Sequence, residues 1–345
     1  MGLTIREVAK AAGVSTATVS YVLNERGKVG RNTRDLVLTT VKHLGYVPNI
    51  HARRLASHNA LMLGMIVSDF ENPFFTDIIK GFLERTRQLG YEAILSDTNY
   101  DPQRTREAAR RMMAHNVSGV AIMTSEINPR LVKELARRKI AVMFLDSGPA
   151  QRYVSTLSID YDSGIRQIVQ HLYALGHHRI AFVAGRAKLK SNLARLHAFE
   201  TSMAALGLKP GPVLHGDLRF EGGLAAGLAI AKMSPLPTAV VAVNDLTAIG
   251  VMKALVSCGC RIPQDISVTG FDRTRLAEYN TPSVTTVDIR RDSLGRTAAD
   301  VLHELCTSTN PRGKKYDISA ELVVGQSTGA ATASPLRAGP VSCNR

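Results

Sequence analysis

The chain has 345 residues and a formal net charge of +14 at pH 7, with 43 Lys and Arg against 29 Asp and Glu. This length is too great for one small core and predicts a small module joined to a larger two-lobed body. No apolar run could span a bilayer and no signal-peptide pattern opens the chain, so we expect a cytoplasmic protein with no membrane partner. The four cysteines lack zinc-finger spacing, so we expect free thiols and no metal or other cofactor.

Residues 4–24 have the pattern of two short helices joined by a tight turn. Thr4 followed by Glu7 predicts a capping-box start, and Gly13 suits the left-handed residue that ends a helix. Ser15 is a natural N-cap for the second helix. This arrangement predicts a helix-turn-helix whose second helix presents its N-terminal residues to base edges, although an ordinary pair of core helices has the same pattern.

The predicted second helix has one apolar and one outward face. Val19, Val22 and Leu23 would point inward, whereas Thr16, Ala17 and Tyr21 would point outward. A third helix is expected from about residue 32 to residue 44, ended by Gly45. Its expected inward positions are Leu36, Val37, Thr40, Val41 and Leu44.

The N-terminal segment is strongly basic. Residues 1–58 hold nine Lys and Arg but three acidic residues, an excess of six positive charges. Such an excess is typical of a module that binds the phosphate backbone, the alternative being a solvated basic face. Pro48 and Asn49 then begin a helix of about two turns, which is too short to be stable alone. We expect it to fold on DNA and to insert Leu55 into a minor-groove step, unless Leu55 merely packs on its own module.

The runs TIREVAKAAGVSTATVSYVLN and TRDLVLTTVKHLGYVPNIHARRLA closely resemble the lactose/purine repressor family of bacterial transcription regulators. The resemblance covers about residues 3–327 and implies that the protein is a nucleoid-associated, homodimeric repressor that binds near-palindromic double-stranded operator DNA. It places Thr16, Ala17 and Tyr21 at base-reading positions and Leu55 at the intercalating position. The full set of expected DNA contacts is Thr4, Ser15, Thr16, Ala17, Thr18, Tyr21, Asn24, Arg31, Asn49, Ala52, Arg53 and Leu55.

From residue 61 onward, apolar strand-like runs alternate with helical patterns. The runs LMLGMIV, YEAILS, VAIM, IAVMFL, IAFVA, TAVVAV and ISVTG are continuous rather than alternating, as in parallel strands buried on both faces. They predict two α/β lobes that face a cleft. The resemblance implies a type-I periplasmic-binding-protein-like body, with chain crossings near Asp160, Ile289 and Ser319.

These boundaries give the expected domain organisation. The helix-turn-helix domain occupies residues 1–47 and the hinge residues 48–60. The body occupies residues 61–328, followed by a disordered tail over 329–345. Within the body, the expected lobe boundaries are about 61–159 with 290–318 for the N-lobe and 160–289 with 319–328 for the C-lobe.

Polar and aromatic residues follow several strands, where ligands bind in open α/β sheets. Phe74 and Phe75 have the character of ring-stacking residues, with core packing as the alternative. For Asn244 the alternative role is a helix N-cap, and for Arg195 the alternative role is a surface salt bridge. By family position, the expected effector-binding set is Phe74, Phe75, Asp146, Ser191, Arg195, Asn244 and Asp272.

Two aromatic rings with several hydrogen-bonding groups favour a monosaccharide or derivative as the effector, and a purine is the alternative. Lys188 and Lys190 leave open a phosphorylated or carboxylated ligand. No nucleotide-binding or hydrolase motif is present, so we do not expect an enzyme. A sequence-tolerant architectural DNA-binding protein remains the competing function, because it would share the basic hinge.

Overall fold

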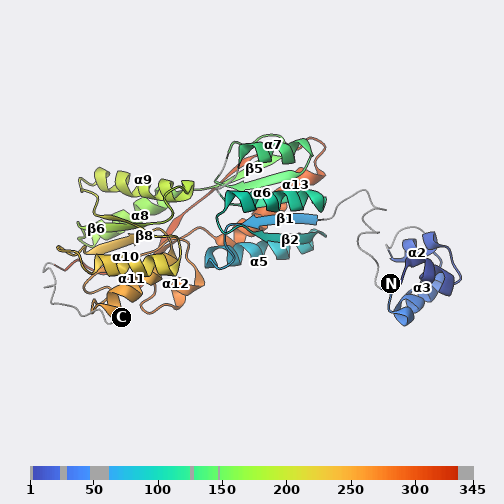
Figure 1. The fold of residues 1–345 in the computed structure, drawn as a ribbon, viewed down its shortest axis with the longest axis horizontal. Coiled ribbons are helices and arrows are strands. Elements are labelled where there is room, and N and C mark those ends of the chain that lie inside the picture. The colour runs from blue at the N-terminus through green and yellow to red at the C-terminus, as the bar shows by residue number, and fades with distance from the viewer. Residues whose placement is uncertain (1–2, 24–28, 47–61, 125–127, 147, 333–345) are drawn as a thin grey trace. The chain divides into compact units, whose positions relative to one another are not determined.

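The computed structural model describes residues 3–23, 29–46, 62–124, 128–146 and 148–332. The chain divides into two compact units, residues 1–60 and residues 61–345, and each is described by itself (Figure 1). Among the described residues, none of the helices combines the length and the apolar composition that a membrane crossing requires.

The N-terminal unit is a three-helix module with one small core. Its helices are α1 (Ile5–Ala11), α2 (Thr16–Leu23) and α3 (Arg31–Leu44). The core holds Val8, Val19, Val22 and Val37, so the inward face predicted for α2 is correct. The inward position predicted for Leu36 is wrong, because 51% of its surface is exposed. The three helices enclose so little volume that only one edge of α3 reaches the core.

Local capping explains the bounds of the first two helices. The Thr4 backbone N–H donates to the Glu7 carboxylate at 2.6 Å, which closes the predicted capping box. Gly13 has φ +64° at the turn, a conformation that costs glycine little. The Ser15 hydroxyl accepts a bond from the Thr18 N–H at 3.1 Å and thereby starts α2.

The N-lobe of the body contains a parallel six-stranded sheet in the order β11-β5-β4-β3-β1-β2. Alternate residues of β1 face opposite sides, with Leu63 and Met65 in one apolar cluster and Met62 and Ile66 in another. Its strands are β1 (Met62–Val67), β2 (Glu92–Asp97), β3 (Gly119–Met123), β4 (Ala141–Leu145), β5 (Val154–Ile159) and β11 (Lys315–Ile318).

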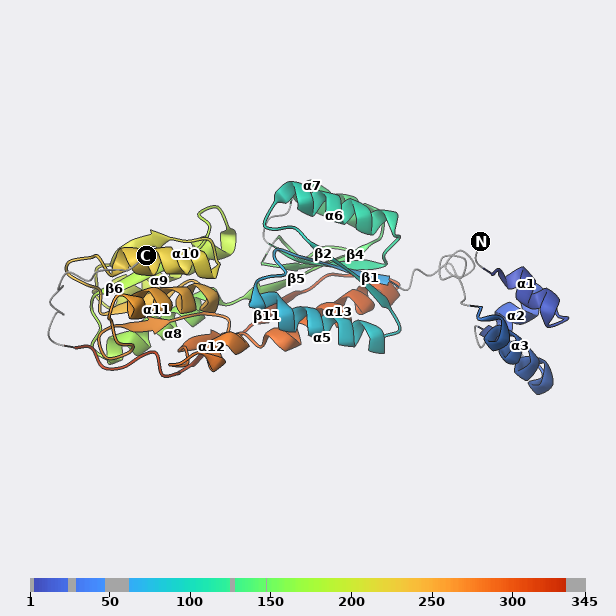
Figure 2. The ribbon, with the colours of Figure 1, turned by 60° about the horizontal axis from the view of Figure 1, so that its bottom comes forward.

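Two pairs of helices cover this sheet. Figure 2 shows α5 (Pro73–Gln88) and α13 (Arg291–Thr307) on one face, with α6 (Pro102–Ala114) and α7 (Pro129–Arg137) on the other. Helices α5 and α13 approach closely at Gly295, where an added Cβ would overlap the Ile78 carbonyl oxygen. This packing fixes α5, whose first turn leads into the cleft.

The C-lobe contains a four-stranded parallel sheet in the order β7-β6-β8-β9. Helices α8 and α9 pack on the face of β6 that bears Phe182, and α10 and α11 pack on the face that bears Val183. The strands are β6 (Ile180–Ala184), β7 (Val213–His215), β8 (Ala239–Ala242) and β9 (Ser267–Thr269). The helices are α8 (Tyr161–Ala174), α9 (Lys190–Ala205), α10 (Phe220–Ile230), α11 (Asp245–Ser257) and α12 (Arg275–Tyr279).

The chain passes between the lobes three times. It leaves the N-lobe after β5 and returns through β10 (Thr286–Asp288) to α13. It leaves again after β11 through β12 (Glu321–Val323), which pairs antiparallel with β10. These passages fall near residues 160, 289 and 319. The Asp160 carboxylate caps α8 by accepting from the Ser163 N–H at 2.9 Å.

The end of the body lies beyond its predicted boundary at residue 328. The Gly329 carbonyl bonds to His177 Nε2 at 2.9 Å, and the Ala331 N–H donates to the Leu175 carbonyl at 2.8 Å. These bonds hold residues 329–331 against the C-lobe, so the expected tail does not begin at 329. Residues 333–345 lie outside the described part of the chain.

Candidate functional site

The exposed face of α2 bears the residues predicted to read bases. Thr16, Ala17 and Tyr21 are exposed, with 52% of the Tyr21 surface open to solvent. Ala17 brings only a methyl group to this face, which suits apolar contact such as with a thymine methyl. This face therefore presents the Tyr21 phenol ring, the Thr16 hydroxyl and the Ala17 methyl group together.

Other predicted DNA contacts lie at helix starts. Thr4, Ser15 and Thr18 take part in the caps of α1 and α2, and the Ser15 and Thr18 hydroxyls are 2.9 Å apart. Arg31 is the exposed first residue of α3. The predicted contacts that lie outside the described residues are Asn24, Asn49, Ala52, Arg53 and Leu55.

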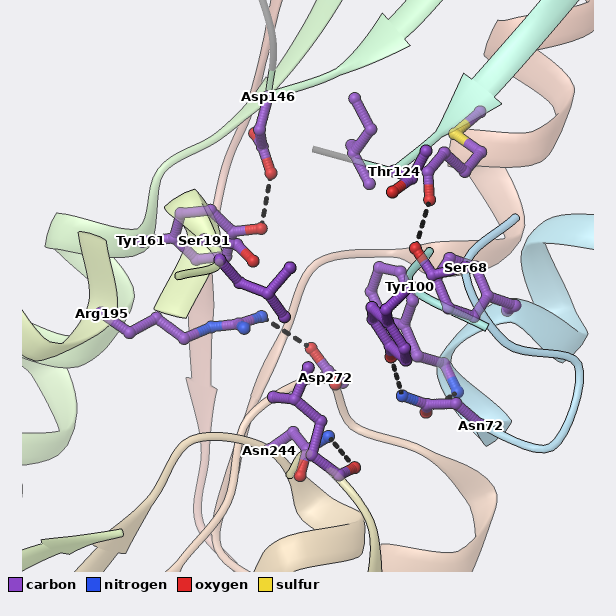
Figure 3. Close-up of a pocket in the computed structure, with 16 residues that line it drawn as sticks. Ser68, Asn72, Tyr100, Thr124, Asp146, Tyr161, Ser191, Arg195, Asn244 and Asp272 are labelled. Atoms are coloured by element: carbon purple, nitrogen blue, oxygen red, sulfur yellow. Dashed lines mark hydrogen bonds and ion pairs between the residues drawn. The ribbon is translucent and has the colours of Figure 1, made fainter. Parts of the chain in front are cut away.

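A second candidate site is a cavity of about 510 Å³, partly open to solvent, between the two lobes of the body. Both lobes contribute to its wall at the carboxyl ends of their parallel strands, where open α/β sheets bind ligands. All seven predicted effector-binding residues line it (Figure 3). They are Phe74, Phe75, Asp146, Ser191, Arg195, Asn244 and Asp272.

Arg195 and Asp272 form a buried ion pair in the C-lobe wall. Arg195 Nη2 lies 3.3 Å from Asp272 Oδ1, and the two side chains are 7% and 4% exposed. The guanidinium also lies 4.4 Å from the Tyr161 ring centroid and 4.7 Å from that of Phe271. The expected alternative of a surface salt bridge is therefore wrong, because Arg195 is buried among aromatic rings.

Asp272 occupies an unusual backbone position. Its φ is +106°, and its N–H donates to the Val287 carbonyl at 3.0 Å while its own carbonyl accepts from Arg291 Nε at 2.7 Å. Burial raises the pKa of the Asp272 carboxyl to about 7, despite the opposing effect of Arg195. Hydrogen-bond donors near this carboxyl favour its ionised form.

Asp146 holds the matching position on the N-lobe side. Its φ is +55°, and its carboxylate accepts from the Ile159 N–H at 2.9 Å and from the Tyr161 hydroxyl at 2.6 Å. Burial raises the pKa of the Asp146 carboxyl above its ordinary value. Each carboxylate oxygen keeps a second lone pair, so the group retains acceptor capacity toward a ligand.

Phe74 and Phe75 open the first turn of α5. Asn72 caps this helix by accepting from the Phe74 N–H at 3.0 Å, and Pro73 suits the first helical position. The two rings are 4.8 Å apart at an interplanar angle of 87°. Both rings belong to the apolar core and both line the cavity. The core-packing alternative is therefore compatible with contact between these rings and a ligand.

Asn244 is the N-cap of α11, as its expected alternative stated. Its amide oxygen accepts from the Thr247 N–H at 2.9 Å, and its nitrogen donates to the Leu218 carbonyl at 3.0 Å. The side chain still lines the cavity, with its orientation fixed by the protein. Ser191 lies in the first turn of α9 and supplies a hydroxyl to the same cavity.

The cavity is also lined by nine residues that the sequence analysis did not assign to this site. Tyr100 contacts Asn72 through its hydroxyl at 3.3 Å, and Arg186 lies over its ring at 4.7 Å. Tyr161 lies between Asp160 and Asp162 directly after β5. The other seven are Ser68, Asn72, Met123, Thr124, Leu145, Leu189 and Leu218.

An ion pair joins the lobes at this cleft. Arg219 precedes α10 in the C-lobe, and its Nη2 lies 2.8 Å from Asp69 Oδ2, after β1 in the N-lobe. The same nitrogen donates to Asn99 Oδ1 at 3.0 Å. This ion pair raises the pKa of Arg219 and links the two walls directly.

The sequence of the N-terminal unit matches the model of the lacI family of bacterial regulatory proteins over residues 4–49. Residues 169–328 match that of a periplasmic binding protein-like domain. The HTH-type transcriptional repressor PurR of Photobacterium profundum is 32% identical over 327 residues, which cover 94% of this chain and 98% of that relative.

The chain belongs to the lacI family of bacterial regulatory proteins. PurR of Haemophilus influenzae (strain PittEE) is also 32% identical, over 94% of this chain and 98% of its own. As a family member, the chain is a DNA-binding transcriptional repressor controlled by a small molecule, and not an enzyme.

Solved structures of the family share the fold. The lac repressor dimer bound to operator and the anti-inducer ONPF has a TM-score of 0.86 at 28% identity, covering 96% of this chain and 100% of that one. The transcriptional regulator CelR in complex with cellobiose has a TM-score of 0.70 at 26% identity, covering 94% and 99%. The helix-turn-helix module and the two-lobed α/β body predicted from the sequence are thereby confirmed.

Proposed function

We propose that a monosaccharide or close derivative binds in the cleft and controls the affinity of this repressor for its operator. The observation that supports this proposal is the pairing of two carboxyl groups, that of half-buried Asp146 and that of buried Asp272, on opposite walls of one cavity. Carboxylates accept hydrogen bonds, and sugar hydroxyls are the donors that such a site accommodates. Ser191 and Arg195 supply donors for the hydroxyl oxygens.

The aromatic side chains favour a saturated ring over a flat one. A purine stacks best between two parallel rings, but Phe74 and Phe75 meet at 87°. On the opposite wall, Arg195 covers the ring of Tyr161. A single ring face beside hydrogen-bonding groups suits the C–H face of a sugar. The relatives named PurR favour a purine, so purines belong in the same experiment.

A thermal-shift screen of the full chain against sugars, sugar phosphates and purines tests this proposal, because a ligand that binds the native state raises its melting temperature. We expect a monosaccharide to give the largest shift. Asp146→Asn removes a carboxylate from the cavity and should reduce that shift. Asp160→Asn is the matched control, because Asp160 caps α8 outside the cavity lining. A shift produced by purines alone would refute the sugar assignment.

We infer that the repressor binds a near-palindromic operator as a cytoplasmic homodimer, with boundaries at residues 1–47 for the DNA-binding domain and 48–60 for the hinge. Exposed apolar side chains on the C-lobe, namely Val256, Leu276 and Tyr279, support self-association. The lac repressor structure that this fold resembles is described as a dimer bound to operator.

We propose that Thr16, Ala17 and Tyr21 read bases while Leu55 from the hinge enters the minor groove. Leu55→Ala should then weaken operator binding while leaving binding to random DNA nearly unchanged. Fluorescence anisotropy at one fixed salt concentration measures both affinities. An equal loss of affinity for both duplexes would refute the insertion of Leu55 into the minor groove. A wild-type specificity ratio near one would instead indicate a sequence-tolerant architectural protein.

A further inference from the structure

A second cavity, of about 600 Å³ and partly open to solvent, lies in the N-lobe and shares no lining residue with the cleft. Its wall is apolar and includes Val132 of α7, Phe144 of β4 and Val154 of β5. Successive residues of β4 point to opposite sides of the sheet, so Phe144 belongs to the cluster under α6 and α7 while Leu145 lines the cleft. The second cavity therefore lies on the α7 side of the sheet, whereas the cleft lies at the carboxyl ends of the strands.

The charged side chains of this second cavity come from both lobes. Lys133 projects from α7 of the N-lobe, and Lys190 is the first residue of α9 in the C-lobe. Neither lysine forms an ion pair with an acidic residue in the described ranges. Both are exposed and hence able to turn toward a ligand.

The surface beside this cavity is also cationic. A wider groove shares Lys133 and Gln151 with the cavity and adds Arg137, Lys139 and Arg152. Every charged side chain that lines the cavity or the groove is positive among the residues that the structure describes. Such one-sided charge attracts anions to a concave surface.

We propose that this cavity binds an amphipathic anion, with an aryl or short acyl body against Phe144 and a phosphate or carboxylate between Lys133 and Lys190. Burial of the apolar body supplies affinity, and the lysine ammonium groups act as point charges for the anion. Because the two lysines belong to different lobes, the bound anion joins the N-lobe to the C-lobe outside the effector cavity.

Isothermal titration calorimetry on the full chain tests the proposal with three probes. 1-Naphthyl phosphate carries both parts, 1-naphthol carries only the apolar body, and inorganic phosphate carries only the anion. We expect 1-naphthyl phosphate to bind at least about tenfold more tightly than either fragment, with a negative heat-capacity change from apolar burial. Equal affinity for 1-naphthyl phosphate and inorganic phosphate would overturn the proposal, because the apolar wall would then play no part.

Variants locate the bound probe. Lys133→Gln and Lys190→Gln should each weaken 1-naphthyl phosphate binding, and the double variant by about tenfold. Lys209→Gln is the matched control, an exposed lysine outside both linings. Asp146→Asn should not change probe binding, because Asp146 lines only the cleft. Unchanged binding in the double variant, or loss in Asp146→Asn, would overturn the assignment.

The DNA backbone is a second kind of anion that this cationic surface could attract. If the double variant loses affinity for random DNA as strongly as for the probe, the lysines serve the phosphate backbone and the small-anion site is refuted. Unchanged affinity for random DNA, together with weaker probe binding, supports the proposed site.

Discussion

The two walls of the cleft are held in place by different forces. The C-lobe wall is fixed by polar bonds within the protein: Arg195 pairs with Asp272, and Asn244 uses both its amide oxygen and its nitrogen. The aromatic part of the N-lobe wall depends on packing, because Phe74 and Phe75 take their positions from α5, and α5 takes its position from α13. Charge changes should therefore disturb the C-lobe wall, and volume changes should disturb the N-lobe wall.

Removing the charge of Arg195 should have the largest effect. Arg195→Met leaves Asp272 buried without its partner, and we expect the free energy of unfolding to fall by about 3 kcal/mol at pH 8. At pH 6 the loss should be smaller, because Asp272 is then protonated. Urea unfolding at the two pH values measures both losses. Arg166→Met is the control, since its pair with Asp162 is exposed. Equal losses at both pH values would contradict this account.

A volume change should disturb the packed wall. Gly295→Ala places a methyl group where the Ile78 carbonyl lies, so α5 and α13 must separate. We expect a loss of about 2 kcal/mol in unfolding free energy, together with weaker effector binding. Gly30→Ala is the matched control, because a Cβ added there meets no atom within 4 Å. Gly90 is unsuitable as a control, because its φ of +79° would strain any other residue. Unchanged effector affinity in Gly295→Ala would show that α5 packing does not set the N-lobe wall.

The pH dependence of effector binding probes the protonation of Asp272. Ligand hydroxyls favour the ionised carboxylate, so affinity should fall by about tenfold between pH 7.5 and pH 6, below the pKa of about 7. Folding has its own dependence: because the folded-state pKa is raised, this contribution to stability is complete below about pH 4 and is lost as the pH rises through about 7. Calorimetric titration should find the pH effect abolished in Asp272→Asn. A flat profile in the wild type would exclude Asp272 as a ligand acceptor.

The ion pair between the walls should give the smallest effect. Arg219 is 31% exposed, so Arg219→Gln should change unfolding free energy by less than about 1 kcal/mol. Effector dissociation, followed by stopped flow, should accelerate by up to about fivefold because the cleft opens more easily. Arg261→Gln removes a comparable pair with Asp265 inside the C-lobe alone. Equal rates in the two variants would show that Arg219 does not hold the walls together.

Much of the fold could be predicted from local patterns. Each of the seven apolar runs overlaps a strand, and Thr4, Gly13 and Ser15 mark helix ends in both sequence and structure. Strand β11 was not predicted, because its sequence KYDI has little apolar character and it forms only by pairing with β5. Leu36 was placed inward because helical periodicity says nothing of how much core is available.

The cavity was predicted less completely than the fold. Residues directly after strands, such as Asp146 and Asp272, could be found from sequence because the carboxyl ends of strands meet at one edge. Leu218 and Tyr100 lie in loops that local patterns do not place, and tertiary contacts alone bring them to the cavity. The partner of Arg195 is 77 residues away in sequence, a pairing that no spacing rule reveals.

The three passages between the lobes mean that neither lobe is a continuous stretch of the gene. A fragment that stops at residue 160 would lack α13 and β11, which complete the N-lobe from the far end of the chain. Truncation therefore cannot yield a separate N-lobe for study, and an exchange of lobes between relatives would need three fused junctions rather than one.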